Sequence, residues 1–568
     1  MTKRISLFTC VIIALALVFT RLHYAEGEDL KVTTWDAFGY YMYVPSTVIY
    51  GDMSELNWFP EVDSTYQLSG GSLYQARQQE DGTYVNKYLG GVAIMQLPSF
   101  VIGHVIAKNS HYKADGFSPP YQYAIAFGAI LYVIVALLML RRILLRYYTD
   151  LSVAMSLLLL GLATNFIQYT AIDSAQSHAY IFFLYVLVLY ATIKWHEAAK
   201  AKWAALIGLT IGFAGICRPT ELIMLFIPLL WGHHTRESRK EKWALVKRYR
   251  RHILFVLLFG LIGIAPQLIY WKVVTGSFVY NVGSKWYFLN PFFRVLFGFE
   301  NGWFIYTPAT ILFVVGFFFI KKYPFQKSVI VFCLLNLWII MAWSDWKYSA
   351  TYSMRALVQS YPVFALASTA LIQRWLAGKW KYVFYPIAAY LIFVNVFQIG
   401  QYNDTVLHYR DMNRRYYSSI YLNPSPTPMD MSLLDTDESF ALLNDVPSTT
   451  LFSLGEETAF TSSSTAPAIL LTNTGEDLNR GWLVVQGDLL STSGFSSSYL
   501  NLHIKADSFE KHSKIRLFSP ISKEGAFNPY AFAMEIPQDL RHYTITVSLE
   551  TTGTFEGAVR DLTLDLAE

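Results

Sequence analysis

Cysteine is scarce in this chain of 568 residues. Only three occur, Cys10, Cys217 and Cys333, and each lies in or at the end of an apolar run. None falls after residue 401, which excludes a disulfide framework in that part of the chain. Their spacing matches no metal-ligand pattern, so we interpret them as small apolar core residues and assign no metal-binding residue.

Charge is also sparse, and neither sign dominates. Asp, Glu, Lys and Arg make up 15% of the residues and the net charge is only +4, so we expect no nucleic-acid partner. Hydrophobic residues make up 54% and aromatic residues 17%. Apolar runs of about 20 residues recur over the first 400 positions, long enough to cross a hydrocarbon core of about 30 Å. The composition therefore predicts a polytopic α-helical membrane protein.

The N-terminus lacks the small-x-small pattern that marks a cleaved signal peptide. Lys3 and Arg4 precede an apolar core, but His23 stands two positions before Ala25, where a small residue would be needed. We therefore expect the first apolar run to be retained as a membrane span.

About eleven spans are predicted, each an apolar run bounded by polar sequence. Their expected ranges are 5–22, 119–140, 152–170, 179–194, 203–217, 219–232, 253–271, 303–320, 328–343, 356–373 and 382–400. No internal repeat or pair of broken helices, as found in many transporters, is visible among them.

The distribution of Lys and Arg predicts the orientation. With the N-terminus inside, the inner segments hold 22 of these residues, and the short outer turns hold 6. This excess fits the positive-inside rule. We expect a protein integral to the cell (inner) membrane, with a cytoplasmic N-terminus and the lipid bilayer as a constant partner.

One apolar run, 87–108, is not counted as a span. It is short, contains Pro98 and His104, and would move the basic segment 141–148 to the outer side if it crossed. We expect a helix that lies in or dips into the outer interface. Residues 23–118 then form one large outer loop with interfacial helices.

The sequence changes character after residue 400. Residues 401–430 include the stretch NPSPTP and are predicted to be a linker. Apolar and polar residues then alternate with period two, as in Tyr543, Ile545, Val547 and Leu549. Such alternation predicts an antiparallel β-sandwich over 431–568, which eleven crossings would place outside the cytoplasm.

Asp36 is the first candidate for chemistry. It lies in TTWDAFGYYMYVPS, just after the first span and among several aromatic rings. One interpretation is a helix N-cap beside an interfacial aromatic belt. The other is a general base whose pKa is raised by partial desolvation, with rings that pack on the faces of a sugar.

Polar groups of the other predicted outer segments complete the candidate site. Lys347 and Arg355 lie eight residues apart, on one face if the segment between them is helical, and could bind a lipid phosphate. Snorkelling at a helix end is the alternative. Arg218 is either a third phosphate ligand or an ion-pair partner of Glu221. Candidate substrate contacts are Tyr40, Tyr41, Lys87, Tyr88, His178 and Asp345.

In the order of its motifs, the chain over residues 1–400 resembles the GT-C superfamily of integral-membrane glycosyltransferases. The resemblance is to the bacterial branch similar to protein mannosyltransferases and aminoarabinose transferases. The motifs are WDAFGYYMYVPS, NKYLGGVAIMQLPSFVIGH, SHAYIFFL, RPTELIMLFIPLL, NGWFIYTPATIL and WSDWKYSATYSMR. The C-terminal sandwich is similar in pattern to carbohydrate-binding domains of such enzymes.

The resemblance implies a sugar donor on a polyprenyl phosphate and transfer to a glycan, lipid or protein acceptor. Asp36 matches the catalytic acid of the first outer loop, and Lys347, Arg355 and Arg218 match phosphate-binding cations. This sequence has Trp-Asp-Ala where well-known members have an Asp-Glu or Asp-Asp pair. A divalent metal is therefore possible but is not required by the sequence, and the cofactor stays open.

Three other functions compete with this one. A transporter would use ionisable groups among the spans as a substrate path. A polysaccharide ligase or an acyltransferase would act at the same membrane, and an acyltransferase would need a histidine-centred site. An assembly scaffold would use the sandwich alone for binding.

Overall fold

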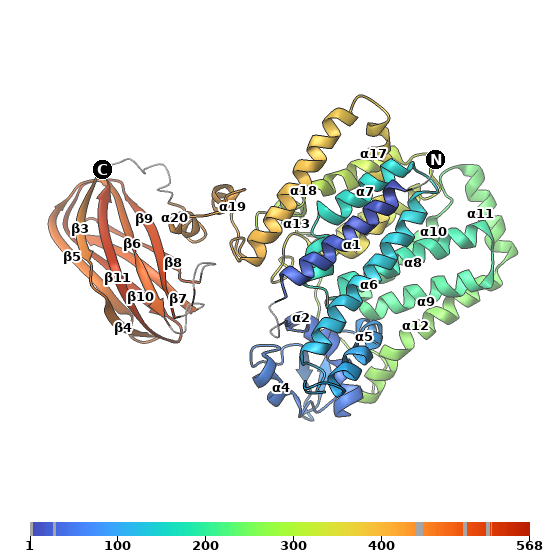
Figure 1. Cartoon of the computed structure of the whole chain (residues 1–568), viewed down its shortest axis with the longest axis horizontal. Helices are drawn as coiled ribbons and strands as arrows, with labels where there is room; N and C mark the ends of the chain where they lie inside the picture. The colour runs from blue at the N-terminus through green and yellow to red at the C-terminus, as the bar shows by residue number, and fades with distance from the viewer. Residues whose placement is uncertain are drawn as a thin grey trace. The chain divides into compact units, whose positions relative to one another are not determined.

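The computed structural model describes residues 4–25, 30–438, 447–491, 497–518, 523 and 525–567. They form two compact units, Met1–Val396 and Phe397–Glu568, which are described separately. The first is helical and the second is mostly β-structure (Figure 1). The predicted fold class is thereby confirmed: an integral membrane protein of many helices followed by a β-sandwich.

Seven helical segments in the described part of the chain are long and apolar enough to cross a membrane. They are α1 (Ile5–His23), α5 (Gly91–Lys108), α6 (Pro119–Leu144), α8 (Ser177–Glu197), α12 (Arg251–Thr275), the segment Arg355–Leu376 that ends in α17 (Tyr361–Leu376), and α18 (Lys381–Asn403). Five shorter apolar segments are Asp150–Leu162 (α7), Ala201–Cys217 (α9), Pro219–Leu230, Pro308–Phe319 and Gln326–Ala342 (α16). Six of the seven long segments and all five short ones coincide with predicted spans, while the number of crossings stays a prediction.

The remaining long helix, α5, is the run that we placed in the outer interface. Tyr132 Oη of α6 donates to the carbonyl of Met95 (3.2 Å), and Gly103 lies against the backbone of Tyr121. The helix therefore runs antiparallel to α6 and covers only its first half. Its place in the outer interface stays a prediction, since α5 is itself long and apolar enough to cross a membrane.

A close contact between two helices shapes the interior. A Cβ added at Gly208 of α9 would lie 2.1 Å from the carbonyl oxygen of Val256 in α12, and one at Gly212 would lie 2.1 Å from that of Gly260. Only glycine allows two helix backbones to approach this closely, as is common between helices in membranes. The glycine seam, Gly208 and Gly212 against Val256 and Gly260, fixes α9 beside α12.

The segment before α6, predicted to be an outer loop, is folded and has its own core. It contains α2 (Trp35–Tyr41), α3 (Tyr43–Pro45), α4 (Phe59–Tyr66) and a hairpin of β1 (Ala76–Gln78) and β2 (Tyr84–Asn86). Phe38, Trp58 and Phe117 are buried together, with ring centroids 5.8–6.3 Å apart. This aromatic core holds α2 in place.

The second unit is a sandwich of two antiparallel sheets with one shared core. One sheet has the order β5-β10-β7-β8, and the other has the order β3-β11-β6-β9 with β4 paired to β11. The strands are β3 (Ser448–Leu454), β4 (Thr458–Ser463), β5 (Ala468–Leu478), β6 (Gly481–Ser491), β7 (Ser498–Ala506), β8 (Phe509–Arg516), β9 (Phe527–Ile536), β10 (Leu540–Thr551) and β11 (Thr554–Ala567). The alternation read from the sequence holds, because Ile545, Val547 and Leu549 are all fully buried.

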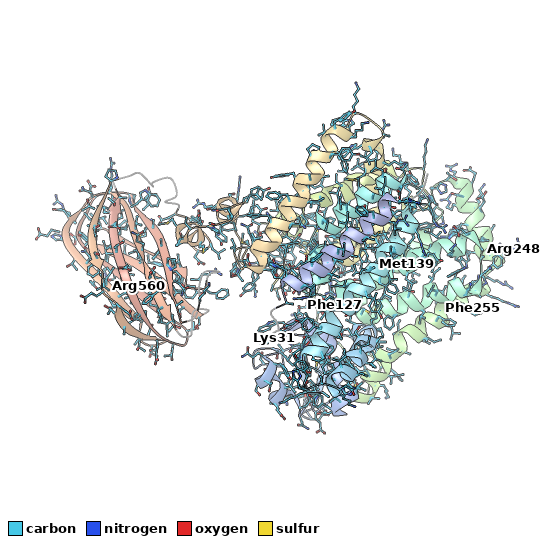
Figure 2. The ribbon with its side chains drawn as sticks, in the orientation of Figure 1. Lys31, Phe127, Met139, Arg248, Phe255 and Arg560 are labelled. Carbon is cyan, nitrogen blue, oxygen red and sulfur yellow. The ribbon has the colours of Figure 1, made fainter. Side chains whose placement is uncertain are left out.

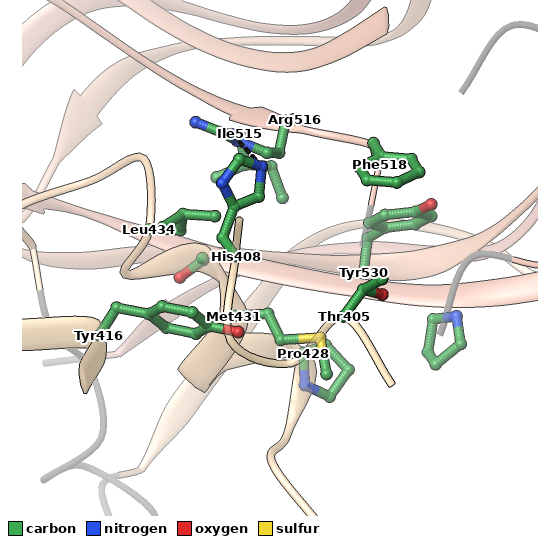
Figure 3. Close-up of a pocket in the computed structure, with 12 residues that line it drawn as sticks. Thr405, His408, Tyr416, Pro428, Met431, Leu434, Ile515, Arg516, Phe518 and Tyr530 are labelled. Carbon is green, nitrogen blue, oxygen red and sulfur yellow. Dashed lines mark hydrogen bonds between the residues drawn. The ribbon is translucent and has the colours of Figure 1, made fainter. Parts of the chain in front are cut away.

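The segment expected to be a linker, 401–430, is instead folded onto this sandwich. It contains α19 (Arg414–Ile420) and begins α20 (Pro428–Ser432). Figure 3 shows His408 facing Arg516 of β8, and that guanidinium also binds Asp435 (2.7 Å) and Asp411 (3.2 Å). The second unit therefore starts before the strands, at Phe397.

Candidate active site

A cavity of about 520 Å³ lies within the first unit. Its walls come from α2, the residues that flank the β1–β2 hairpin, the end of α9, α12, the segment after α12, α16 and the turn at Arg355. Polar and aromatic side chains dominate: Asp36, Tyr40, Tyr74, Lys87, Tyr88, Arg218, Thr220, Glu221, Trp271, Tyr280, Asn281, Ser284, Trp286, Asn336, Trp343, Tyr348, Arg355 and Gln359. Such a concave, ring-lined and polar space is suited to a small polar substrate.

Helical periodicity in α2 decides which of its residues reach the cavity. Asp36 and Tyr40, four positions apart, line the cavity, whereas Phe38 and Tyr41 point into the aromatic core. Tyr41, which we expected to contact substrate, is fully buried there, and its hydroxyl donates to the carbonyl of Gly116 (2.5 Å), so it does not line the cavity. The N-cap position is Thr34, so the reading of Asp36 as an N-cap is wrong.

Asp36 binds three side chains from distant parts of the chain. Its Oδ2 accepts a hydrogen bond from Arg355 Nη2 at 2.6 Å, which is also an ion pair. Its Oδ1 accepts from the hydroxyls of Tyr88 (2.6 Å) and Tyr74 (3.1 Å). The arrangement fixes the carboxylate in one orientation.

These partners decide the pKa of Asp36. Burial raises it, but the positive charge of Arg355 and the hydrogen bonds from Tyr88, Arg355 and Tyr74 together lower it further, to below the ordinary value of 3.8. The raised pKa that we expected from desolvation alone is therefore wrong. Asp36 is an ionised carboxylate at neutral pH.

Arg355 reaches Asp36 from the far end of the membrane unit's sequence. It begins a tight helical turn (Arg355–Ser360) before α17, is 8% exposed in its side chain, and also donates to Gln176 Oε1 (3.2 Å). The residues before it are not helical, since Tyr348, Ser349 and Ser353 all have left-handed backbone angles.

This irregular backbone separates Lys347 from Arg355. The one-face arrangement required a helical segment between them, and none forms. Lys347 lies outside the cavity lining, with its ammonium 5.8 Å from the ring centroid of Trp346. Asp345 also lies outside the lining and accepts from Ser349 (3.2 Å).

Arg218, at the C-terminal end of α9, also lines the cavity. Its Nε donates to the hydroxyl of Tyr40 (3.2 Å), which links it to α2. Glu221, three residues on, is buried in the same wall and accepts hydrogen bonds from Tyr185 and from Gln359 Nε2 (3.0 Å). Glu221 therefore has hydrogen-bond partners in addition to the charge of Arg218, which the sequence suggested as its ion-pair partner.

His178 lies behind the wall. It is fully buried, and its Nδ1 shares a hydrogen bond with Gln359 Oε1 (2.7 Å). Because Gln359 also binds Glu221, the three side chains form a chain of contacts that holds the wall. His178 supports the cavity and does not line it.

The structure thus brings together six of the predicted residues. Those that line the cavity are Asp36, Tyr40, Lys87, Tyr88, Arg218 and Arg355, whereas Tyr41, His178, Lys347 and Asp345 do not. Lining residues that were missed include Tyr74, Glu221, Trp271, Tyr280 and Gln359. Of these residues, only Glu221 could have been found from the sequence, because it lies three residues after Arg218. Within the ranges that the structure describes, no group of three His, Cys, Asp or Glu could hold a metal ion.

Comparisons with known proteins return similar structures only. No family model and no curated protein matches the chain. The oligosaccharyltransferase AglB of Archaeoglobus fulgidus, solved with an inhibitory peptide and a dolichol-phosphate, is 13% identical with a TM-score of 0.43, over 78% of this chain and 61% of that one. Its apo form is 11% identical with a TM-score of 0.41, over 78% and 62%. The arabinosyltransferase EmbB of Mycobacterium smegmatis is 12% identical with a TM-score of 0.31, over 98% and 64%.

Both similar proteins are glycosyltransferases by name. The chain spans about three-fifths of their length. At these TM-scores the similarity by itself assigns neither a substrate nor a catalytic residue, so the function is derived from the cavity.

Proposed function

We propose that this protein transfers a sugar from a polyprenyl-phosphate donor to an acceptor outside the cytoplasm. The observation that supports this most is the cavity itself, which joins an ionised carboxylate, Asp36, to two guanidinium groups, Arg355 and Arg218. Aromatic rings line the space between them. The excess of Lys and Arg in the predicted inner segments supports an outward-facing cavity in the cell (inner) membrane.

The two arginines would bind the donor phosphate. A guanidinium offers paired N–H donors that match phosphate oxygens, and it keeps its charge when buried. Arg355 and Arg218 both line this one cavity, and we assign both to the donor phosphate. Lys347, expected to share this role, lies outside the cavity, and we assign it no phosphate contact here.

Asp36 would act on the acceptor. Its carboxylate accepts a hydrogen bond from the acceptor hydroxyl, whose oxygen attacks the anomeric carbon of the donor. As the new carbon–oxygen bond forms, the bond from that carbon to the phosphate oxygen breaks, and its electron pair leaves with the phosphate. The hydroxyl proton passes to Asp36. Attack from the side opposite the phosphate inverts the configuration.

The low pKa of Asp36 fits a late proton transfer. A carboxylate held by Arg355 removes a proton poorly from a neutral alcohol, but the alcohol oxygen becomes strongly acidic once it is bonded to the sugar. The donor phosphate also raises the pKa of Asp36, since its negative charge competes for Arg355. Donor binding would therefore make the base stronger.

A transfer assay with purified protein in lipid nanodiscs tests the proposal. Labelled polyprenyl-phosphate sugars are offered singly with candidate glycan, lipid and protein acceptors to wild type, Asp36→Asn and Glu61→Gln. Glu61 is an exposed acid on α4 of the same outer loop and does not line the cavity, so it is the matched control.

The proposal predicts that wild type and Glu61→Gln consume one donor and that Asp36→Asn does not. Equal turnover by all three would move the base to another cavity acid, such as Glu221. Movement of a labelled solute into proteoliposomes without donor consumption would establish the transporter and overturn the proposal.

A further inference from the structure

The segment after α12, residues 277–297, exposes an unusual number of large apolar side chains. Leu289 is fully exposed and Val279 is 75% exposed. The exposed apolar residues of this segment are Phe278, Val279, Tyr287, Phe288, Leu289, Phe293 and Phe297. In water this surface would be costly, so something covers it.

The same segment also forms part of the cavity wall. Tyr280, Val282 and Trp286 line the cavity, while their neighbours Val279 and Leu289 point away from it. One face of the segment therefore lines the cavity, and the other face is exposed. Backbone hydrogen bonds join it to the end of α16, including Tyr287 N to the carbonyl of Ala342 (2.6 Å) and Phe292 N to that of Met341 (2.7 Å).

Its apolar surface continues that of α12. Only Gly263 and Gln267 of this helix are buried, and its outer face carries large apolar side chains, Phe255 among them (Figure 2). In an integral membrane protein such a face contacts lipid. The helix ends at Gly276, and Phe278 and Val279 extend the apolar surface from there.

Cations accompany the rings. The ammonium of Lys272 lies 5.5 Å from the ring centroid of Phe278, and the guanidinium of Arg294, which is 72% exposed in its side chain, lies 6.0 Å from that of Trp346. The ammonium of Lys347 also lies near Trp346, 5.8 Å from its ring centroid. Rings mixed with long cationic side chains are typical of the membrane–water boundary, where the cations reach lipid phosphates.

We propose that residues 277–297 are seated in the outer leaflet of the bilayer. Phe278, Val279 and Leu289 enter the acyl boundary, and Lys272, Arg294 and Lys347 contact head-group phosphates. Contact with head groups gives Lys272, Arg294 and Lys347 a role, although none of them lines the cavity. It also makes one wall of the cavity part of the membrane surface, so that a lipid-linked donor, if the proposed function holds, reaches the cavity from within the bilayer.

A cysteine probe tests the contact. All three native cysteines are buried, so an environment-sensitive fluorophore on Leu289→Cys or Val279→Cys reports one position. Glu80→Cys, at the exposed tip of the β1–β2 hairpin, is the matched control in the same outer region. The labelled full chain is placed in nanodiscs and quenched either with nitroxide-labelled lipid or with aqueous iodide.

The expected result is a blue-shifted emission at positions 279 and 289, with quenching by nitroxide lipid and loss of quenching by iodide. Position 80 should show the reverse. Iodide quenching at 279 and 289 with no effect of nitroxide lipid would overturn the proposal. So would protection from both quenchers together with energy transfer between labelled copies, which would make the surface a contact between two chains. No transfer activity enters this readout, so failure of the proposed function would leave the contact standing.

Discussion

Asp36 and Arg355 are separated by 319 positions in the sequence, yet Oδ2 of the first lies 2.6 Å from Nη2 of the second. Each is preceded by strained backbone, because Trp35 and Ser353 both have left-handed angles that side chains rarely adopt. Strain of this kind persists only where the surrounding structure imposes it. The ion pair is thus built by the whole membrane unit.

The substitution Arg355→Lys keeps the positive charge but removes the planar guanidinium with its paired N–H donors. Lysine cannot bind Asp36 and Gln176 together, and it would hold a phosphate less well. We expect transfer activity to fall about 10²- to 10³-fold. This is the usual effect of removing one hydrogen-bond donor that stabilises negative charge developing in the transition state. Steady-state kinetics in nanodiscs measures it, and unchanged kcat/KM would remove Arg355 from the site.

The low pKa of Asp36 predicts how its stabilising effect depends on pH. A carboxyl whose folded-state pKa is lowered contributes stability above its unfolded value of 3.8, and this contribution is lost as pH falls through the folded value. The difference in Tm between wild type and Asp36→Asn should therefore be constant from about pH 5 to 8 and shrink only below about pH 4. If the difference in Tm shrinks between pH 5 and 7 instead, the pKa of Asp36 is raised in the folded state, which contradicts this prediction.

Tyr88→Phe keeps the ring and removes the hydroxyl that donates to Asp36 at 2.6 Å. Without this bond the carboxylate is no longer held in one orientation toward the acceptor, so transfer should fall about tenfold or more even though the pKa of Asp36 rises. Tyr74→Phe, whose bond is longer at 3.1 Å, is the matched control and should have the smaller effect. The pH dependence of kcat/KM distinguishes the two variants, and an equal effect of both would contradict the assignment.

Gly39→Ala should damage the site without touching a polar group. A Cβ at Gly39 would lie 2.2 Å from the ring of Tyr88 and would push it away from Asp36. Alanine in a helix is otherwise favoured over glycine by about 1 kcal/mol. Gly400→Ala in α18, with open space at its Cβ, is the control and should leave Tm and transfer unchanged or slightly raise Tm. Wild-type transfer by Gly39→Ala would show that the position of Tyr88 is not critical.

The fold could be predicted from the sequence where one physical pattern dominates. Long apolar runs give membrane helices, and period-two alternation around Ile545 and Val547 gives a buried strand of the sandwich. The folded segment 401–430 could not be predicted, because its order comes from contacts such as Asp411 with Arg516, far apart in the sequence.

The site was predicted where a polar residue stands out against apolar surroundings, as Asp36 and Arg218 do. Tyr74 and Gln359 could not be found in this way, since rings and amides are common in this sequence and only tertiary packing selects these two. Lys347 was misplaced for a related reason. Its direction depends on left-handed residues that no periodicity reveals.

At two positions where α9 touches α12, the chain has no side chain between the helix backbones. Gly208 and Gly212 meet the opposite backbone directly, so even one added methyl group would part the two helices and, with them, the walls that carry Arg218 and Trp271. Evolution cannot change the width of the cavity by small steps at these two glycines. Related proteins with a wider or narrower cavity would differ at other lining residues, while the seam stays the same.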